Sequence, residues 1–292
     1  YEVAQFRREG PYSDGRRPDH VAPADPQQDA ERRDFTINGM FHDPSGDGLI
    51  DFVGGQRDLA EGLIRAIGKP QARFAEDGLR TLRAIRFATR LNFRIDAATW
   101  TALVLAAPTI KRISSERVRD ELTRIWTEGG AAHGLELMFE AGLLQHVLPE
   151  VAAMKGVPQP AEFHPEGDVW EHVRLMMASI DILVDPSPTL AWGVLLHDIG
   201  KPPTFQPSSA TAARIRFDGH DAKGAEMVDQ IAQRLRFANR DRTRIRDLTA
   251  HHMRFRNVQA MRRSKLKRFL REEFFPELLE LHRIDCQASH GL

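Results

Sequence analysis

The sequence predicts an α+β protein whose strands are confined to an N-terminal part and whose remainder is helical. The first 60 residues are rich in Gly, Pro and Asp and contain short β-favouring segments, whereas apolar residues recur at helical spacing from Leu59 onward. The chain has 292 residues, of which 41% are hydrophobic and 28% charged, a composition typical of a globular protein of about two domains. A disordered chain and a mini-protein are therefore excluded.

Three short segments in the N-terminal part favour strands. They span residues 2–6, 35–41 and 49–53, and turn-forming residues separate them. Residues 12–28 contain Gly15 and three prolines but few apolar side chains, so we expect an exposed loop there. The strands are thus expected to be short and joined by turns.

The helical part of the chain begins near Leu59. Apolar residues recur every three positions from Leu79 to Leu91, which predicts a helix with one buried face. A second helix is expected over residues 115–126, and two or three short helices are expected to follow up to Ala153.

A segment rich in Gly and Pro at residues 155–165 is the strongest candidate for a domain boundary. Asp168 follows it as a candidate N-cap for an apolar-faced helix. Another helix is expected over residues 190–196 and is expected to stop at Gly200, with two prolines beyond it as terminators. The rest of the chain is expected to be helical, with an interruption near residues 207–216. The expected domains are a head over residues 1–60, a neck over 61–160 and a helical domain over 161–292.

The net charge of zero conceals two basic segments. Residues 69–124 contain twelve Lys or Arg and six Asp or Glu, and residues 234–271 contain fourteen Lys or Arg and two Asp or Glu. Clustered basic side chains neutralise phosphate groups well, so the two segments favour a polyanionic partner. A solvated helix face is the alternative interpretation of either segment.

The sequence contains neither a membrane span nor a disulfide framework. The longest uncharged apolar run, residues 189–196, is far shorter than the ~20 residues of a membrane-spanning helix. Cys286 is the only cysteine, so the cytoplasm is the expected compartment. The chain begins at Tyr1 and has no signal-peptide pattern, so we expect a fragment of a longer protein.

A series of arginines is expected to occupy one helix face. Asp77 precedes them by three residues and is expected on the same face. A carboxylate accepts a hydrogen bond from an exocyclic amino group and a guanidinium donates to the neighbouring ring acceptor, so an Asp–Arg pair can read the edge of cytosine or adenine. An exposed ion pair is the alternative interpretation. The arginines are Arg80, Arg83, Arg86, Arg90 and Arg94.

Four motifs occur in a fixed order around this helix. Together they resemble the class II tRNA nucleotidyltransferase and poly(A) polymerase family. The resemblance implies a nucleotidyltransferase palm, of which the first 60 residues are the C-terminal part, followed by a helical neck. The motifs are ERRDFTIN at 31–38, DFVGG at 51–55 with Asp58, EDGLRTLRAIRF at 76–87, and RISSER at 112–117 with Glu121.

The resemblance also assigns roles to single residues. Arg33, Asp34 and Asn38 are expected at the ribose and triphosphate of the incoming nucleotide. Asp77 and Arg80 are expected to read its base. The same resemblance adds Arg83 and Arg117 to the nucleotide-binding set. It implies that four residues couple the head to the neck, namely Asp51, Gly54, Gly55 and Asp58. It also implies that Arg112, Glu116 and Arg117 brace the neck helices.

The sequence departs from the family pattern at two points. The family has a paired-carboxylate motif, Asp-x-Asp, which holds the Mg²⁺ ions for nucleotidyl transfer, and this sequence has none. The chain as written is therefore expected to transfer no nucleotide. Gly78 replaces the usual proline and Gly39 replaces the usual alanine, and both changes loosen the backbone beside motif residues.

The second half of the chain contains a set of histidines and aspartates. His197 and Asp198 end an apolar helix, where burying the pair without a cation would cost free energy. Nitrogen and carboxylate ligands without a thiolate suit divalent ions such as Mn, Mg, Ni, Co or Fe. The expected metal ligands are His172, His197, Asp198 and Asp285.

The order of these residues is similar to the signature of the HD phosphohydrolase superfamily. That similarity implies an all-α HD domain that hydrolyses phosphate esters. It assigns His220 and His252 to a second metal or a substrate phosphate, and it makes Lys201 a phosphate-contacting residue. His197, Asp198 and Lys201 are the expected catalytic residues.

Both resemblances fit one protein, because many bacterial CCA-adding enzymes carry an HD module after the neck. The expected function is addition of C and A nucleotides from CTP and ATP to the 3′ end of tRNA or another RNA, with a metal-dependent phosphohydrolase activity. A poly(A) polymerase, a stand-alone HD phosphohydrolase with an RNA-binding remnant head and a non-catalytic RNA-binding protein are the alternatives. No membrane partner is expected, and the sequence leaves the oligomeric state open.

Overall fold

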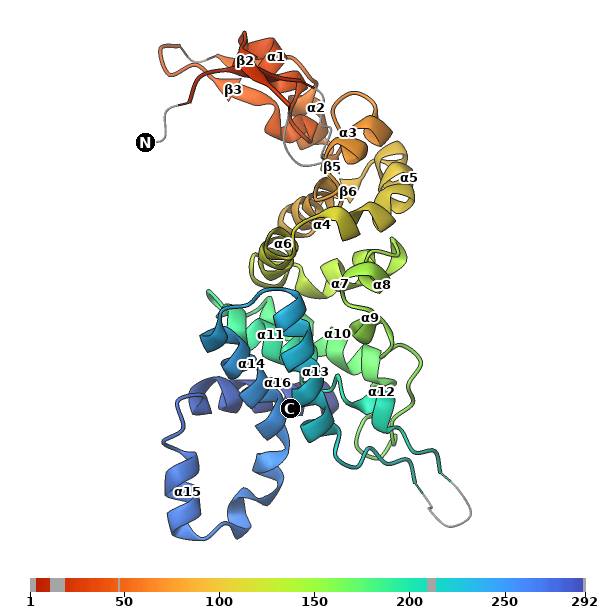
Figure 1. The fold of residues 1–292 in the computed structure, drawn as a ribbon, viewed down its shortest axis with the longest axis vertical. Coiled ribbons are helices and arrows are strands. Elements are labelled where there is room, and N and C mark those ends of the chain that lie inside the picture. The colour runs from red at the N-terminus through yellow and green to blue at the C-terminus, as the bar shows by residue number, and fades with distance from the viewer. Residues whose placement is uncertain (1–3, 11–18, 47, 209–213, 291–292) are drawn as a thin grey trace. The chain divides into compact units, whose positions relative to one another are not determined.

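A computed structural model describes residues 4–10, 19–46, 48–208 and 214–290 of the chain (Figure 1). The chain divides into two compact units. The first unit comprises Tyr1–Glu121 and Leu137–Val147, and the second comprises Leu122–Glu136 and Leu148–Leu292. Helices α6 (Ser115–Thr127) and α7 (Ala131–Glu140) contribute residues to both units. The division into head, neck and helical domain at residues 60 and 160 stays a prediction.

The strands that the structure describes belong to the first unit, and the α+β prediction is confirmed. They form three two-stranded sheets. Of the strand expected at residues 2–6, positions 2 and 3 lie outside the described residues, and the observed strand starts at Arg7. The pairs are β1 (Arg7–Glu9) antiparallel to β2 (Val21–Pro23), β3 (Met40–His42) antiparallel to β4 (Leu49–Asp51), and β5 (Leu63–Ile64) parallel to β6 (Arg94–Ile95).

Two predictions for the N-terminal part were wrong in detail. Part of the loop expected at residues 12–28 lies outside the described residues, and the remainder forms β2 and the start of helix α1 (Pro26–Glu31). The strand expected at residues 35–41 is a 3₁₀ turn, η1 (Thr36–Asn38), followed by β3. The side chains of Asp34 and Thr36 cause this bend, because they bond to the Phe35 amide and to Asp58 instead of leaving the backbone extended.

The helices of the first unit hold the arginine-rich segment against an apolar core. The apolar face of α4 is fully buried through Leu82 and Ile85, and Asn92 ends the helix in the left-handed conformation with φ 54°. Asp51 caps the start of α2 by accepting bonds from four successive amides, those of residues 53 to 56. The helices are α1, α2 (Gly55–Ala60), α3 (Pro70–Glu76), α4 (Arg80–Leu91), α5 (Ala97–Ala106), η2 (Ala107–Arg112) and α8 (Leu144–Val147).

The second unit is helical and is built around α11, which packs against α10, α14 and α16. The predicted cap of α10 is confirmed, since the Asp168 carboxylate accepts a 2.8 Å bond from the Glu171 amide. Pro202 and Pro203 were expected as terminators, but both lie inside α12, at whose start proline is tolerated. The elements are α9 (Pro149–Ala152), α10 (Val169–Ile180), α11 (Pro188–Leu196), α12 (Lys201–Thr204), α13 (His220–Arg234), α14 (Asn239–His251), η3 (His252–Ala260), α15 (Arg263–Phe269) and α16 (Phe275–His290).

A close approach between two elements of the second unit depends on Gly200. A Cβ atom at this position would lie 2.1 Å from the carbonyl oxygen of His220 and 2.6 Å from the amide nitrogen of Gly224. Only glycine allows the chain after α11 to come this near to the start of α13. The approach brings the His197–Asp198 pair next to His220. Among the helices of the described residues, none is long and apolar enough to cross a membrane.

Candidate functional site

The first unit brings together residues that are far apart in the sequence. Asp34 is buried, and its carboxylate accepts a 2.6 Å bond from Nε of Arg83 and a 3.2 Å bond from Nδ2 of Asn38. Arg33 donates to the carbonyl oxygen of Asn38 at 2.8 Å and pairs with Asp29 at 3.0 Å. Four of the predicted nucleotide-binding residues therefore form one connected set.

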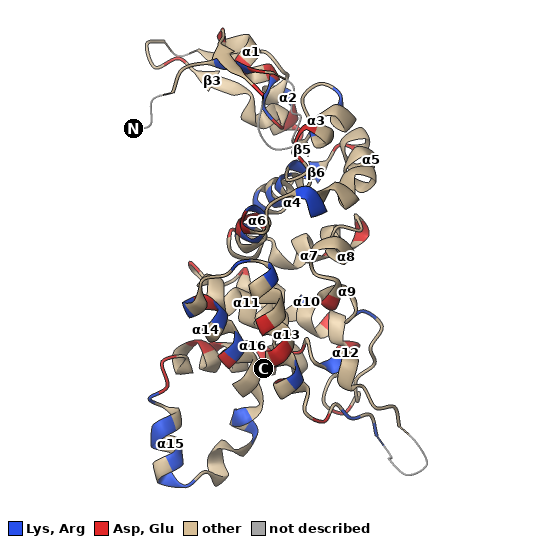
Figure 2. Cartoon of the chain, in the orientation of Figure 1, with Lys and Arg blue, Asp and Glu red and all other residues tan. Residues whose placement is uncertain are grey.

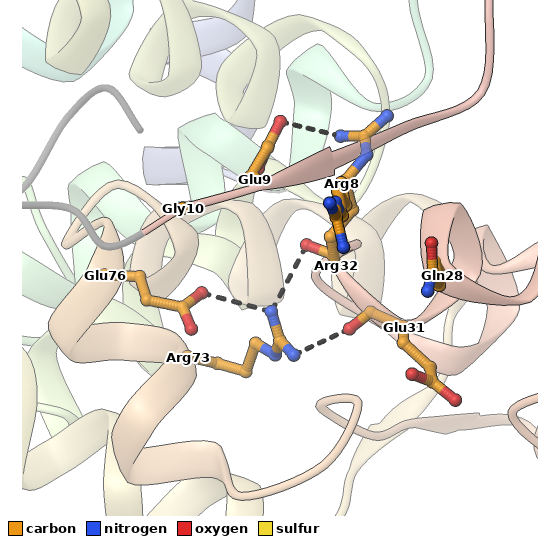
Figure 3. Close-up of a pocket in the computed structure, with 8 residues that line it drawn as sticks. All are labelled: Arg8, Glu9, Gly10, Gln28, Glu31, Arg32, Arg73 and Glu76. Atoms are coloured by element: carbon orange, nitrogen blue, oxygen red, sulfur yellow. Dashed lines mark hydrogen bonds and ion pairs between the residues drawn. The ribbon is translucent and has the colours of Figure 1, made fainter. Parts of the chain in front are cut away.

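A pocket of about 300 Å³ lies beside this set (Figure 3). Arg73 of α3 points into it and donates to the carbonyl oxygens of Glu31 and Arg32 at the end of α1, at 2.6 and 3.3 Å. Its guanidinium also pairs with Glu76 at 3.1 Å. The volume is at the lower end of the range for small-molecule sites. The lining residues are Arg8, Glu9, Gly10, Gln28, Glu31, Arg32, Arg73 and Glu76.

Asp77 and Arg80 do not share a helix face, and that prediction was wrong. Asp77 lies in an extended turn before α4, with φ −148°, and its carboxylate accepts from the Leu79 amide at 3.0 Å and from Arg117 at 2.6 Å. Arg80 donates instead to Glu76 and to the carbonyl oxygen of Arg73. The turn arises because the Asp77 side chain bonds two residues ahead. Arg94, also expected on the helix face, lies in β6.

Glu121 joins two arginines of α4 in the interior of the first unit. Its carboxylate accepts a 2.6 Å bond from Nε of Arg86 and a 3.3 Å bond from Arg83. Burial raises the pKa of Asp34, but the charge and hydrogen bonds of Arg83 outweigh it and hold the pKa of this carboxyl below its usual value. Sequence analysis assigned no role to Arg86, Arg73 or Asp29. The spacing of Asp29 and Arg33, four positions apart, is the one signal that could have found such a pair.

In the second unit, six predicted residues from different elements lie together. His172 comes from α10, and Asp285 from α16 lies 3.3 Å from its Nε2 atom. His197 and Asp198 follow α11, with Nε2 of His197 3.1 Å from the Asp198 carboxylate. The other Asp198 oxygen faces Nε2 of His220, at 3.6 Å, and Nε2 of His252, at 3.7 Å. The structure thus brings the whole predicted set into one buried cluster, here called the His–Asp cluster.

Hydrogen bonds fix the orientation of each imidazole in the His–Asp cluster. Three rings direct Nδ1 at a backbone carbonyl three residues earlier, so Nδ1 donates to that carbonyl and Nε2 faces the interior of the cluster, where Nε2 of His220 and Nε2 of His252 lie 3.2 Å apart. The fourth ring, that of His172, directs Nδ1 at the carboxylate of Glu166 at 2.7 Å. The backbone contacts join His197 to Val194 at 2.9 Å, His220 to Phe217 at 2.8 Å and His252 to Thr249 at 2.7 Å.

The donor atoms of the His–Asp cluster fit divalent cations. Nε2 of His172 and Nε2 of His197 are buried and have no aligned hydrogen-bond partner, although each faces a carboxylate. Two groups of three residues each place their ligand atoms within 4.8 Å of one another. Imidazole and carboxylate ligands without a thiolate are typical of Mn, Ni, Co, Fe and Mg sites. The groups are His172, His197 and Asp285, and Asp198, His220 and His252.

The same arrangement shifts the pKa values of the imidazoles. Burial lowers the pKa of His172, but Asp285, Glu166 and Asp198 outweigh it and raise the pKa to about 9. Burial and the neighbouring rings of His197 and His220 lower the pKa of His252 to about 4, against the attraction of Asp198. The carboxylates therefore hold one positive charge at His172, which a cation bound at its Nε2 atom would replace.

Two residues beside the His–Asp cluster were not predicted: Gln159 lies in the segment interpreted as a domain boundary, and Glu166 directly follows it. Gln159 accepts a bond from the ammonium of Lys201, which also lies 2.6 Å from Asp198. Burial raises the pKa of Glu166, but the bonds from His172 and His164 lower it to about 2. An acidic residue just before the helix of a predicted ligand was the available signal for Glu166.

Three family models match separate segments of the chain. Residues 1–65 match the poly A polymerase head domain, and residues 92–155 match the probable RNA and SrmB-binding site of polymerase A. Residues 169–285 match the HD domain, and this match includes His172, the His197–Asp198 pair and Asp285.

Two curated relatives are similar to most of the chain. The chain is 36% identical over 278 residues to an A-adding tRNA nucleotidyltransferase of Deinococcus radiodurans. The aligned region covers 92% of this chain and 62% of that relative. The chain is 39% identical over 215 residues to a multifunctional CCA protein of Neisseria gonorrhoeae, covering 72% of this chain and 49% of that protein. The chain thus spans between about half and two thirds of the length of the relatives it matches.

Solved structures of similar fold are CCA-adding enzymes. The enzyme of Bacillus stearothermophilus in complex with CTP superposes with a TM-score of 0.68 at 22% identity, covering 100% of this chain and 60% of that one. The Thermotoga maritima enzyme complexed with tRNA has a TM-score of 0.56 at 23% identity, covering 89% of this chain and 57% of that one. The chain therefore belongs to the class II tRNA nucleotidyltransferase and poly(A) polymerase family and carries an HD domain in its second half.

Proposed function

We propose that this chain is part of a tRNA nucleotidyltransferase that adds C and A nucleotides to RNA 3′ ends. The observation that carries the proposal is the 36% identity, over 92% of the chain, to a protein named an A-adding tRNA nucleotidyltransferase. The multifunctional CCA proteins at 32% to 39% identity support it further. A poly(A) polymerase, the alternative, would be recognised by a longer tail of A nucleotides on the RNA 3′ end.

The first unit binds the incoming nucleotide in this proposal. Arg33, Asp34 and Asn38 contact the sugar and phosphates, while Asp77 and Arg80 select the base. Asp77 bonds to Arg117 and Arg80 bonds to Glu76, so the base of CTP or ATP must replace these protein partners when the nucleotide binds.

Mg²⁺ for nucleotidyl transfer has no ligands in the first unit that match the family pattern, since the sequence contains no Asp-x-Asp pair. We therefore derive no transfer step from these residues. The full-length gene product tests the transferase proposal: it should incorporate CTP and ATP but not UTP or GTP into a tRNA transcript. The double variant Asp77→Ala, Arg80→Ala should lose this preference among nucleotides, and an unchanged preference contradicts the assignment.

We further propose that the His–Asp cluster is the centre of a metal-dependent phosphohydrolase. His172, His197, Asp198 and Asp285 hold one cation, and His220 and His252 hold a second cation or the substrate phosphate. A bound cation supplies Lewis-acid activation of water and of a phosphate ester. Lys201 places its ammonium beside Asp198, where it attracts a phosphate oxygen. Burial of the cluster keeps competing water away from these charges.

The 292-residue chain itself tests the hydrolase proposal. It should hydrolyse phosphate monoesters or 2′,3′-cyclic phosphates in the presence of Mg, Mn, Ni or Co, and it should transfer no nucleotide. Asp198→Ala should abolish hydrolysis, whereas Asp241→Ala in α14, outside the cluster, should retain it. Absence of bound metal together with absence of turnover with every ion overturns the proposal. Hydrolysis without nucleotidyl transfer in the full-length product supports the stand-alone phosphohydrolase, and RNA binding without either activity supports the binding protein.

A further inference from the structure

The second unit carries a basic surface, inside the basic segment 234–271, that neither of the two proposed sites includes. Between Asp247 and Glu272 the sequence has eight Lys or Arg residues and no carboxylate. Figure 2 shows the basic residues gathered on α15 and on the segment before it. We call this set the α15 surface; it consists of Arg254, Arg256, Arg262, Arg263, Lys265, Lys267, Arg268 and Arg271.

The cations of the α15 surface are exposed, and the described part of the chain offers them no carboxylate partner. All except Arg254 are exposed to solvent. The arginines of α14, just before this surface, are different: Arg242 pairs with Asp229 at 2.8 Å, and Arg244 pairs with Glu273 at 2.7 Å. Pairing within the protein thus ends where the α15 surface begins.

A buried aromatic anchor holds this surface in place. Phe269 of α15 is fully buried, and its ring packs against Phe255 at 5.4 Å and against Phe275 at 5.2 Å. The guanidinium of Arg254 lies 4.2 Å from the centre of the Phe269 ring. The anchored helix carries four of the exposed cations, Arg263, Lys265, Lys267 and Arg268. Side chains that bind a partner lose less conformational entropy there than on a loose tail.

Seven exposed like charges within residues 256–271 repel one another, and this repulsion is relieved when a polyanion neutralises them. The chain belongs to a family of RNA-modifying enzymes, so RNA is the polyanion that we expect to bind here. We propose that the α15 surface binds the phosphate backbone of the RNA substrate, at a place outside residues 92–155, which match the family's RNA-binding segment. This inference rests on the proposed transferase function.

The test is the salt dependence of RNA binding by the full-length gene product. A fluorescent tRNA transcript is titrated with protein between 50 and 200 mM salt, for the wild type and for the triple variant Lys265→Gln, Lys267→Gln, Arg268→Gln. The slope of log K against log salt should decrease in magnitude by roughly two to three, because about 0.7 to 0.9 counterions are released per phosphate contact. The affinity at 150 mM salt should fall about tenfold or more.

A matched control removes the same charge from the same unit. Lys223→Gln, Arg240→Gln, Arg283→Gln changes three exposed cations that each lie near a carboxylate, and it should leave slope and affinity close to wild type. Lys265→Arg, Lys267→Arg retains the charge and should bind like wild type. Thermal unfolding of every variant shows whether the fold is retained.

The outcomes separate this inference from the proposed function. Equal loss of affinity in the triple variant and in the control overturns the α15 surface as the RNA site. Unchanged RNA binding by the triple variant also overturns this assignment. If the same variant no longer binds phosphatidylserine vesicles, the α15 surface binds a membrane instead. Either result leaves the transferase proposal standing if the wild type binds tRNA, whereas a wild type that does not bind tRNA contradicts both.

Discussion

The two units use ionisable side chains in opposite ways. In the first unit, the charges around α4 are neutralised within the protein: Arg83 bonds to Asp34, and Arg86 bonds to Glu121. In the second unit, the imidazoles of His172 and His197 direct buried Nε2 atoms at carboxylates without forming aligned hydrogen bonds. Paired charges hold segments of the chain together, whereas the buried imidazole and carboxylate atoms of the His–Asp cluster fit a divalent cation.

The largest effect is expected from breaking a pair in the first unit. Glu121→Gln removes the negative charge that lies 2.6 Å from the guanidinium of Arg86, which is 4% exposed. Removing one partner of a buried ion pair typically costs 3–5 kcal/mol, so the free energy of unfolding should fall by about 3–5 kcal/mol. Urea-induced unfolding measures this change.

Glu116→Gln is the matched control for Glu121→Gln. Glu116 lies on the same helix, α6, and is exposed, so its substitution should change the free energy of unfolding by no more than about 0.5 kcal/mol. Similar effects of the two substitutions would show that the buried pairs do not hold the first unit together.

The next effect concerns metal binding in the second unit. A cation at 100 times its dissociation constant stabilises the folded state by about 2.7 kcal/mol, and chelation should reverse this. Hydrogen exchange should slow in α10 and α11, which surround the His–Asp cluster, and remain unchanged in α4. Asp198→Ala should abolish the response. Equal slowing of hydrogen exchange in α4 would mean that metal binding stabilises both units, which contradicts the contrast drawn between them.

A smaller effect is expected from the carboxylate that orients His172. Glu166→Gln keeps the size of the side chain but weakens its hold on the His172 ring, and loss of such a partner typically lowers metal affinity 10- to 100-fold. Calorimetric titration with Mn²⁺ or Ni²⁺ measures this affinity. Glu162→Gln, an exposed change in the same segment, should leave it unaltered. Equal affinities of the two variants would limit Glu166 to a packing role.

The sequence predicted the members of the His–Asp cluster better than the pairs of the first unit. The order of a histidine, an adjacent His–Asp pair and a late aspartate pointed to His172, His197, Asp198 and Asp285, and the resemblance to the HD superfamily added His220 and His252. The pairs Asp34–Arg83, Asp77–Arg117 and Arg86–Glu121 join positions 35 to 49 residues apart, and no local periodicity encodes such contacts.

Errors at single elements also had local causes. Asp77 and Asp34 redirect the backbone with their side chains, which apolar spacing does not reveal. Gln159 and Glu166 were not predicted because they lie in or directly after a segment rich in Gly and Pro, which is typical of a linker. Glu166 nevertheless bonds to His172, and Gln159 bonds to Lys201 beside the His–Asp cluster. Predicting such residues requires the packing of the segment and not its composition.

The smallest effect expected is the acid sensitivity of the Asp34–Arg83 pair. Since the pKa of Asp34 is lower in the folded protein than in the unfolded chain, the pair stabilises the fold above the unfolded value, about 3.9, and this contribution is lost as the pH falls through the folded value. The difference in free energy of unfolding between wild type and Asp34→Asn should therefore be constant from pH 7 to 5 and shrink as the pH approaches 3. Urea unfolding at each pH measures it. A difference that does not change with pH would mean that Asp34 acts through its shape and hydrogen bonds and not through its charge. Paired charges would then stabilise the first unit less than the contrast between the two units implies.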